Sequence, residues 1–263
     1  MGFLVDAYSD KGIKKEVNQD ALLVKQASVN GIGNICLGVL CDGMGGLSCG
    51  EVASSSFIDR MDEWFKNIFP TLLIDNDKTI SLGGDTFSYD KEALKKKIEL
   101  SWKQLVTEMN HKLKAYGEDN HIRLGTTVVA IIIIGDIYLS MNVGDSRGYI
   151  FDKKSIEMIS HDQSYVQQQI ELGRMTVEEA ERSDKKSVLL QCVGASEQVI
   201  PEFFEGKIRK GCHFILCSDG FWRKISNQEI VSIASRPKGL EQLALMAMQR
   251  GENDNISSLI ISV

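Results

Sequence analysis

Blocks of alternating apolar and polar positions fill most of this chain, and their spacing predicts both helices and strands. From Gly50 to Ile68, apolar residues recur at steps of three and four, which predicts an amphipathic helix that Pro70 ends. The same spacing over residues 91–116 predicts a second long helix. Since a polar loop over residues 71–90 joins them, we expect an antiparallel helix pair that covers a sheet.

Short apolar runs between turn residues predict the strands. The run over residues 35–41 predicts a buried strand that ends at Asp42. Residues 126–134 are rich in β-branched side chains without interruption, which is typical of a strand buried on both faces. The same criteria predict strands at residues 137–143, at 149–151 as a continuation of that meander, at 213–217 and at 256–263.

Capping boxes at residues 176–179 and 226–229 mark the starts of two further helices, and helical spacing adds residues 164–172 and 240–248. Helices are therefore predicted both before and after a series of strands, and consecutive strands in that series are expected to pair as hairpins. The sequence therefore predicts an α+β fold of largely antiparallel sheets with helices packed on them. Because no repeat or linker divides the chain, we expect residues 1–263 to form one domain.

Composition and charge limit the classes of function. The chain has 263 residues, of which 43% are hydrophobic and 25% charged, as is typical of a soluble globular protein. Its formal net charge is -6 and its Lys and Arg residues form no stripe, so we expect no nucleic-acid partner. The longest apolar run, residues 128–134, is too short to cross a bilayer, so we expect no membrane partner.

The cysteines indicate a reducing environment. There are six, and no two form the Cys-x-x-Cys pair of a zinc or redox motif. Several lie inside apolar runs, where a free thiol packs as a small hydrophobic group. Because the first residues also lack the pattern of a signal peptide, we expect a cytoplasmic protein. We also expect the chain to be monomeric.

The most informative polar feature is a set of aspartates that each adjoin a glycine or a small polar residue. Several of them follow apolar runs that read as strands. Hard divalent cations take oxygen ligands from distant chain segments, and carboxylates crowd together only around such a cation. The sequence therefore predicts a metal centre made of oxygen ligands, which favours phosphate chemistry. The set consists of Asp20, Asp42, Asp145, Asp219 and Asp254.

Each of these aspartates is by itself also an ordinary turn residue, and a glycine-rich turn explains Asp42-Gly43 without a metal. The combination indicates more, because Asp42, Asp219 and Asp254 could together hold two cations about 3.5–4 Å apart. Such a pair lowers the pKa of a water between the ions and so creates a hydroxide nucleophile. It also neutralises the charge that develops on a phosphoryl group during in-line attack.

Short motifs follow one another in a fixed order along nearly the whole chain. They include Asn18-Gln19-Asp20, Asp42-Gly43-Met44-Gly45-Gly46, Gly125-Thr126-Thr127, Gly144-Asp145-Ser146-Arg147, Asp162-Gln163-Ser164, Ser218-Asp219-Gly220 and Asp254-Asn255-Ile256. In this order they resemble the metal-dependent serine/threonine phosphatases of type 2C, in their compact bacterial form. The resemblance implies two packed antiparallel β-sheets flanked by helix pairs, a four-layer αββα sandwich. It also implies hydrolysis of phosphoserine and phosphothreonine on proteins, and an opposing serine/threonine kinase.

The resemblance further implies roles for individual residues. Asp42 would bridge two Mn²⁺ or Mg²⁺ ions, and Gly43 would bind one of them through its carbonyl group. Asp219 and Asp254 would bind the other ion.

Additional positions acquire roles in the same way. Asp20 would lie close by and support metal-bound water, and Asp145 with Asp219 would hold a weaker third ion. Lys15 stands where the family usually has an arginine that binds the substrate phosphate. Residues 163–195 correspond to the variable flap beside the active site.

The chain departs from the family pattern at several positions. Lys15 offers a point charge in place of the bidentate arginine fork, and Gln19 replaces a glutamate that contacts metal-bound water. Met44 and Gln163 stand where the family often has histidines. Because no predicted carboxylate ligand is lost, we expect an active enzyme.

Two rival functions stay open. Cys217 and Arg223 fit the Cys-x5-Arg pattern of cysteine phosphatases, although Asp219 would place a carboxylate inside the phosphate cradle. The other rival is a non-catalytic relative that binds phosphoproteins or senses a ligand, which only Lys15 and Gln19 favour.

Two side chains near the motifs have both a catalytic and a structural interpretation. His161 could act as a general acid or base, but a lone histidine in a loop is more often structural. For Arg147 we expect an ion pair that orients the loop of Asp145 rather than contact with substrate.

Overall fold

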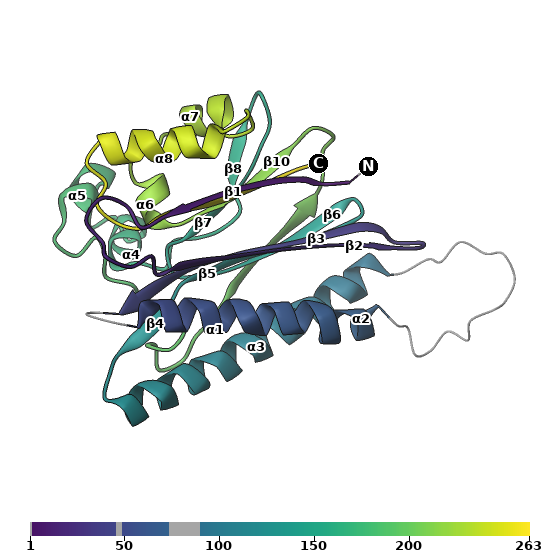
Figure 1. Ribbon diagram of the computed structural model, residues 1–263, viewed down its shortest axis with the longest axis horizontal. Helices are drawn as coiled ribbons and strands as arrows, with labels where there is room; N and C mark the ends of the chain where they lie inside the picture. The colour runs from purple at the N-terminus through teal and green to yellow at the C-terminus, as the bar shows by residue number, and fades with distance from the viewer. Residues whose placement is uncertain (1, 46–48, 74–89) are drawn as a thin grey trace, which may run out of the picture.

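Two antiparallel β-sheets stacked face to face form the centre of the molecule (Figure 1). The computed structural model describes residues 2–45, 49–73 and 90–263. The first sheet contains, in spatial order, β1 (Leu4–Asp10), β11 (Ile256–Ser262), β10 (His213–Cys217), β7 (Arg147–Phe151) and β8 (Ile156–Met158). The second contains β2 (Asp20–Val29), β3 (Gly33–Gly45), β5 (Val128–Ile134), β6 (Ile137–Val143) and β9 (Glu202–Lys207), with β4 (Leu124–Thr126) paired to β3.

Strand β5 shows why the two sheets stack. Every one of its residues is buried, as its continuous β-branched run predicts. Val129, Ile131 and Ile133 pack toward the first sheet, whereas the alternate residues face the helices. The sheets approach so closely at Gly38 that a Cβ atom there would lie 2.9 Å from Ile261 Cδ1.

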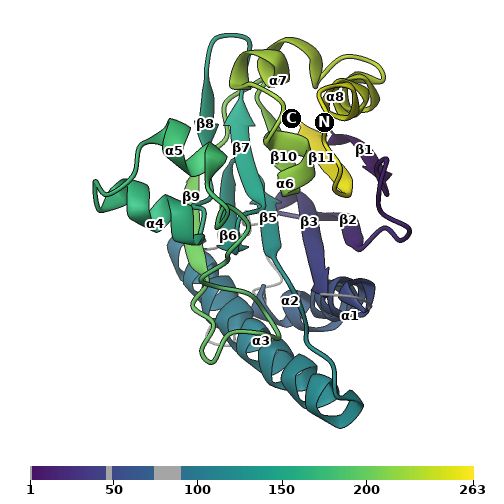
Figure 2. The same cartoon turned by 90° about the vertical axis from the view of Figure 1, so that its left-hand side faces the viewer.

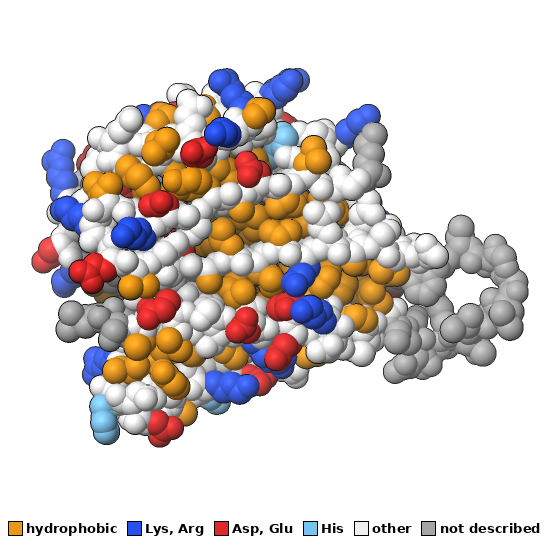
Figure 3. Space-filling model, in the orientation of Figure 1, with side chains coloured by type: hydrophobic (Ala, Val, Ile, Leu, Met, Phe, Trp, Pro, Cys, Tyr) orange, Lys and Arg blue, Asp and Glu red, His pale blue; other side chains and the backbone are white. Residues whose placement is uncertain are grey.

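The edge strands β1 and β2 lie one above the other, and hydrophobic side chains fill the seam between them (Figures 1 and 3). Val5, Leu22 and Val24 are partly buried there against the core between the sheets. On the face in Figure 3, Lys and Arg side chains are interspersed with Asp and Glu. Within the described ranges, no helix is both long enough and apolar enough to span a membrane.

Helices cover the outer face of the second sheet: α1 (Gly50–Glu63), the π-helical turn η1 (Trp64–Ile68), α2 (Phe69–Leu72) and α3 (Lys91–Asn120) (Figure 1). Helices α1 and α3 run in opposite directions, as their patterns predict. The prediction that Pro70 ends the first helix is wrong by two residues, because the helical run continues through Pro70 to Leu72. Residues 74–89 of the predicted loop lie outside the described residues.

The other outer layer consists of α6 (Asp219–Trp222), α7 (Asn227–Ile233) and α8 (Gly239–Gln249), packed on the first sheet. At one end of the sandwich lie α4 (Tyr165–Glu171) and α5 (Val177–Arg182), which Figure 2 shows beside β8 and β9. Both predicted capping boxes form, at Thr176 with Glu179 and at Ser226 with Glu229. The helix, sheet, sheet and helix layers confirm the predicted αββα sandwich.

Three strand predictions need correction. Strand β7 does not continue the meander of β5 and β6, because Gly144, with φ +97°, turns the chain into the other sheet. Strand β3 does not end at Asp42 but continues to Gly45. The predicted strand 126–134 is divided at Thr127, whose backbone N–H donates to the Asp42 carbonyl oxygen.

Candidate metal centre

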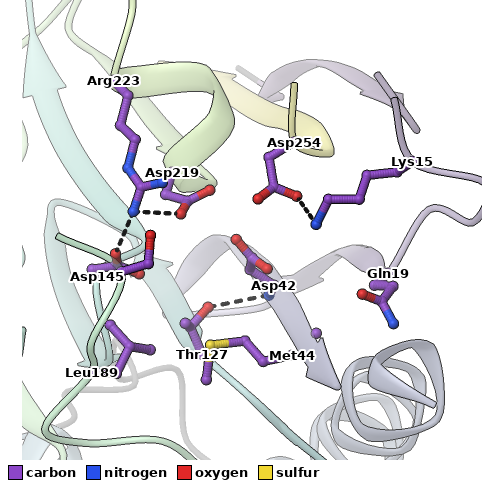
Figure 4. A pocket seen from close by; sticks show the side chains of 12 residues that line it. Lys15, Gln19, Asp42, Met44, Thr127, Asp145, Leu189, Asp219, Arg223 and Asp254 are labelled. Atoms are coloured by element: carbon purple, nitrogen blue, oxygen red, sulfur yellow. Dashed lines mark hydrogen bonds and ion pairs between the residues drawn. The ribbon is translucent and has the colours of Figure 1, made fainter. Parts of the chain in front are cut away.

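The predicted aspartates meet at one end of the sandwich, although they come from distant parts of the chain (Figure 4). Asp42 belongs to β3, Asp145 to the turn between β6 and β7, and Asp219 to the first residue of α6. With Asp254, which precedes β11, they line a cavity of about 240 Å³. Asp20 is paired directly with Asp42 across β2 and β3, and both of its carboxylate oxygens are buried.

Backbone contacts hold Asp42 in this position. Its N–H donates to Thr127 Oγ1 over 3.1 Å, and Thr127 Oγ1 is 2.7 Å from Ser146 Oγ. The next residue, Gly43, donates its N–H to the carbonyl oxygen of Gln19 over 3.0 Å. The β2–β3 pair and the turn that carries Asp145 are therefore connected through Asp42.

The carboxylates carry more negative charge than their surroundings neutralise. Burial raises the pKa of Asp42 well above its ordinary value, and the charges of Asp20 and Asp219 raise it further. Burial also raises the pKa of Asp20 to about 7, that of Asp145 to about 8 and that of Asp219 to about 6. Both oxygens of Asp20 and Oδ1 of Asp219 are buried without a hydrogen-bond partner among the described residues. These unpartnered oxygens fit a divalent cation, because oxygen ligands and excess negative charge are what such an ion requires.

Two side chains of the protein itself supply positive charge in the cavity. Lys15 Nζ lies 2.6 Å from Asp254 Oδ1. Arg223 Nη2 lies 2.8 Å from Asp219 Oδ2 and 3.5 Å from Asp145 Oδ2. Over residues 2–45, 49–73 and 90–263, no three acidic, thiol or imidazole groups stand in a ready-made metal cage. Since Lys15 and Arg223 hold oxygens of three acids, metal binding requires some of these side chains to turn.

The residues that depart from the family pattern also have defined contacts. Gln19 lines the cavity, and its amide donates to Glu51 Oε2 over 3.2 Å. Met44 lines the cavity as well. Gln163 accepts a hydrogen bond from the Gly144 N–H over 3.0 Å, so it supports the turn that carries Asp145.

Sequence reasoning missed the role of Arg223, whereas Arg147 forms an ion pair, as expected. Arg147 pairs with Asp162 (Nη2 to Oδ2, 2.7 Å) rather than with Asp145, and its guanidinium carbon lies 3.4 Å from the ring centre of Trp222. Asp145 instead pairs with Arg223, one helical turn after Asp219. The i,i+4 spacing of Asp219 and Arg223 was the available signal.

His161 has the structural role. Its Nδ1 lies 2.9 Å from Glu202 Oε1 and its Nε2 2.5 Å from Glu171 Oε1. It is absent from the residues that line the metal-centre cavity. Partial burial lowers the pKa of the imidazole, but the two carboxylates outweigh this and the net shift is upward. His161 therefore links β9 to α4 rather than offering a free acid or base.

The structure contradicts the cysteine-phosphatase interpretation. The Cys217 side chain is fully buried, and burial raises the pKa of its thiol to about 12, so no thiolate forms near neutral pH. Arg223, the arginine of the Cys-x5-Arg pattern, turns to Asp219 and Asp145 instead.

Comparison with known proteins identifies the family. The pattern of the family described as Protein phosphatase 2C matches residues 12–255. The serine/threonine protein phosphatase PstP of Mycobacterium tuberculosis is 28% identical over 260 residues, which cover 98% of this chain but 44% of that protein. This chain thus spans less than half the length of that relative. The protein phosphatase PhpP of Streptococcus pneumoniae is 27% identical over 265 residues, which cover 98% of this chain and 97% of PhpP.

A solved structure agrees with these sequence relatives. The catalytic domain of serine threonine protein phosphatase PstP in complex with 2 manganese ions is 25% identical, with a TM-score of 0.72 over 99% of this chain and 97% of that one. Together, the sandwich, the converging aspartates and the extent of the match show that the chain belongs to the protein phosphatase 2C family.

Proposed function

We propose that this protein hydrolyses phosphoserine and phosphothreonine in proteins, using Mn²⁺ or Mg²⁺. The observation that carries the proposal is the convergence of Asp42, Asp219 and Asp254 on one cavity. Its relatives named as serine/threonine phosphatases support the same reaction, and the manganese complex of PstP supports the metal. Phosphorylated proteins as substrates require an opposing serine/threonine kinase. The free, mostly buried cysteines fit the reducing cytoplasm in which we place the protein.

The chain offers a specific set of ligands. We assign Asp42 and the Gly43 carbonyl to one side of a two-ion centre, and Asp219 with Asp254 to the other. Asp20, the buried cross-strand partner of Asp42, would accept hydrogen bonds from water at the ions. When bound, the two cations would lower the pKa of a water between them to give the attacking hydroxide and would neutralise the phosphoryl oxygens.

The other residues of the cavity bind and enclose the substrate. Lys15 reaches over the cavity from the loop before β2, and its side chain is 43% exposed. Once a cation takes Asp254, the ammonium group is free to bind a phosphate oxygen. Ser187 and Leu189 also line the cavity. They belong to residues 163–195, which we therefore propose as the flap that limits access of water and substrate.

Removal of metal tests the proposed function directly. With Mn²⁺, the protein is expected to release phosphate from a phosphothreonine peptide, and an excess of chelator should abolish that activity until Mn²⁺ is restored. Cys217→Ala is the matched control and should retain activity within about twofold, because the thiol is buried and protonated. Turnover that survives chelation would rule out the proposal. Tight Mn²⁺ binding without any turnover would favour the non-catalytic alternative.

Lys15→Met is expected to raise the KM for a phosphothreonine peptide by about 10-fold, while Lys15→Arg stays close to wild type. A hydrogen bond to a charged group contributes about 1.5–3 kcal/mol, which corresponds to a loss of at least about tenfold. Steady-state kinetics at saturating Mn²⁺ provide the measurement. An unchanged KM in the methionine variant would show that Lys15 serves only to neutralise Asp254.

A further inference from the structure

Arg223 lies between two of the converging aspartates (Figure 4). Its Nη2 atom is 2.8 Å from Asp219 Oδ2 and 3.5 Å from Asp145 Oδ2. The side chains of Arg223 and Asp219 are 17% and 14% exposed, and that of Asp145 is 7% exposed. The guanidinium therefore neutralises two largely buried carboxylates inside the cavity.

The surroundings of Arg223 keep it in this place. Asp219 begins α6 and Arg223 directly follows its last residue, Trp222, which donates its Nε1–H to the Asp145 carbonyl oxygen over 2.9 Å. The guanidinium carbon of Arg223 lies 5.7 Å from the ring centre of Trp222. The guanidinium carbon of Arg147 lies 3.4 Å from the same ring centre. Lys15 differs, because it contacts a single oxygen and its side chain is 43% exposed. Lys15 can leave its aspartate easily, whereas Arg223 is held on several sides.

The two oxygens of Asp219 are used differently. Oδ2 pairs with Arg223, while Oδ1 is buried without a hydrogen-bond partner in the described part of the chain. One oxygen thus remains for a cation on the side of Asp42 and Asp254, and the other is already occupied. Asp145 also faces the guanidinium, through Oδ2 at 3.5 Å. A divalent cation between Asp145 and Asp219 would have to displace the guanidinium or sit beside a like charge.

We propose that Arg223 is a built-in cation that takes the place of a divalent ion between Asp145 and Asp219. The centre then binds ions only on the side of Asp42 and Asp254, and Asp145 is a positioning residue rather than a metal ligand. This inference rests on the proposed function, since it concerns the same metal centre. It replaces the expectation that Asp145 and Asp219 hold a third ion.

The number of bound Mn²⁺ ions tests the inference without reference to turnover. Equilibrium dialysis with metal analysis is expected to give about two ions per chain for the wild type, and the same number for Asp145→Asn. Arg223→Met, which removes the charge but keeps much of the length, should gain one further, weaker site. That site should disappear in the double variant Arg223→Met with Asp145→Asn. Arg223→Lys should keep the wild-type number.

Arg250→Met is the matched control, because Arg250 also forms an arginine–carboxylate pair, with Glu229 (2.6 Å), and neither residue lines the metal-centre cavity. It should bind as many ions as the wild type. A wild-type third ion that Asp145→Asn abolishes would overturn the inference, as would an unchanged number in folded Arg223→Met. If Arg223→Met does not fold by circular dichroism, the comparison of wild type with Asp145→Asn decides alone. Failure to bind any Mn²⁺ would overturn the proposed function as well, whereas a third wild-type ion overturns only this inference.

Discussion

Replacing Asp42 with asparagine is expected to lower turnover of a phosphothreonine peptide by at least about 100-fold, because charge stabilisation by bound metal is worth several kcal/mol. Asp42 pairs with Asp20 across β2 and β3 and lines one cavity together with Asp145, Asp219 and Asp254. An amide has no negative charge to hold two cations. The measurement is kcat/KM across a range of Mn²⁺ concentrations, to separate weaker metal binding from slower chemistry.

The same substitution is expected to stabilise the metal-free protein. Burial and the neighbouring carboxylates raise the pKa of Asp42, so ionising it costs more in the folded state than in the unfolded state. That cost is absent below the unfolded pKa and grows as the pH rises toward the folded pKa, so at neutral pH the neutral asparagine avoids it. Thermal unfolding in chelator should therefore give a higher Tm for Asp42→Asn than for wild type at pH 7. The difference should shrink as the pH is lowered toward 4.

Asp136→Asn provides the control for both measurements. Asp136 lies in the turn between β5 and β6, and its side chain is 61% exposed. It forms an ion pair with Lys91 of α3. Its replacement should leave kcat/KM within about twofold and change stability by less than about 1 kcal/mol, as is usual for surface ion pairs. If Asp42→Asn loses activity but also loses stability in chelator, then misfolding rather than metal loss explains the defect. Wild-type activity in Asp42→Asn would remove Asp42 from the centre.

Gly43→Ala is expected to destabilise the protein by about 3 kcal/mol and to impair Mn²⁺ binding. A Cβ atom at this position would lie 2.2 Å from the Gly50 carbonyl oxygen and 2.5 Å from that of Gln19. Both are backbone atoms, so relief requires α1 or the segment before β2 to move away from β3. Such a movement would also shift Asp42 and the Gly43 carbonyl, which we assign to one ion. Chemical denaturation and Mn²⁺ titration measure the two effects.

Gly148→Ala is the matched control, because Gly148 is also a buried strand glycine. A Cβ atom there would approach its nearest neighbours at 3.3 Å, and these are side-chain atoms of Ile159, Leu216 and Val129, which can adjust. Gly148→Ala should therefore be destabilised by at least about 1 kcal/mol less than Gly43→Ala, and it should bind Mn²⁺ normally. Equal destabilisation by the two substitutions would show that the contact with α1 and Gln19 is not what makes Gly43 necessary.

Local pattern predicted the elements whose signal lies within a few residues. The β-branched run of β5 reported burial on both faces, and the capping boxes located the starts of α5 and α7. The weaker strands β1, β2, β8 and β9 carry mixed patterns with exposed positions and gave no such signal. A strand at a sheet edge needs only one apolar face, so its sequence is less distinctive.

Contacts between distant segments could not be predicted in the same way. The sequence indicated an ion pair for Arg147, but only the structure shows that its partner is the carboxylate of Asp162 and that it lies over the ring of Trp222. The chain also passes from one sheet to the other at Gly144, although β6 and β7 follow each other closely and both are buried. Which strand pairs with which depends on long-range packing, and apolar character alone does not report it.

The sequence by itself determined the family, the αββα architecture and the acids that could hold metal, because the order of short motifs and the period of apolar residues are local properties. Only the tertiary structure decided which charges meet in the cavity. Lys15 forms an ion pair with Asp254, although the two residues lie near opposite ends of the sequence. Arg223 forms ion pairs with both Asp219 and Asp145. Such pairings arise because folding buries several like charges together, and buried charge is tolerated only where the packed chain or a bound ion supplies the opposite sign.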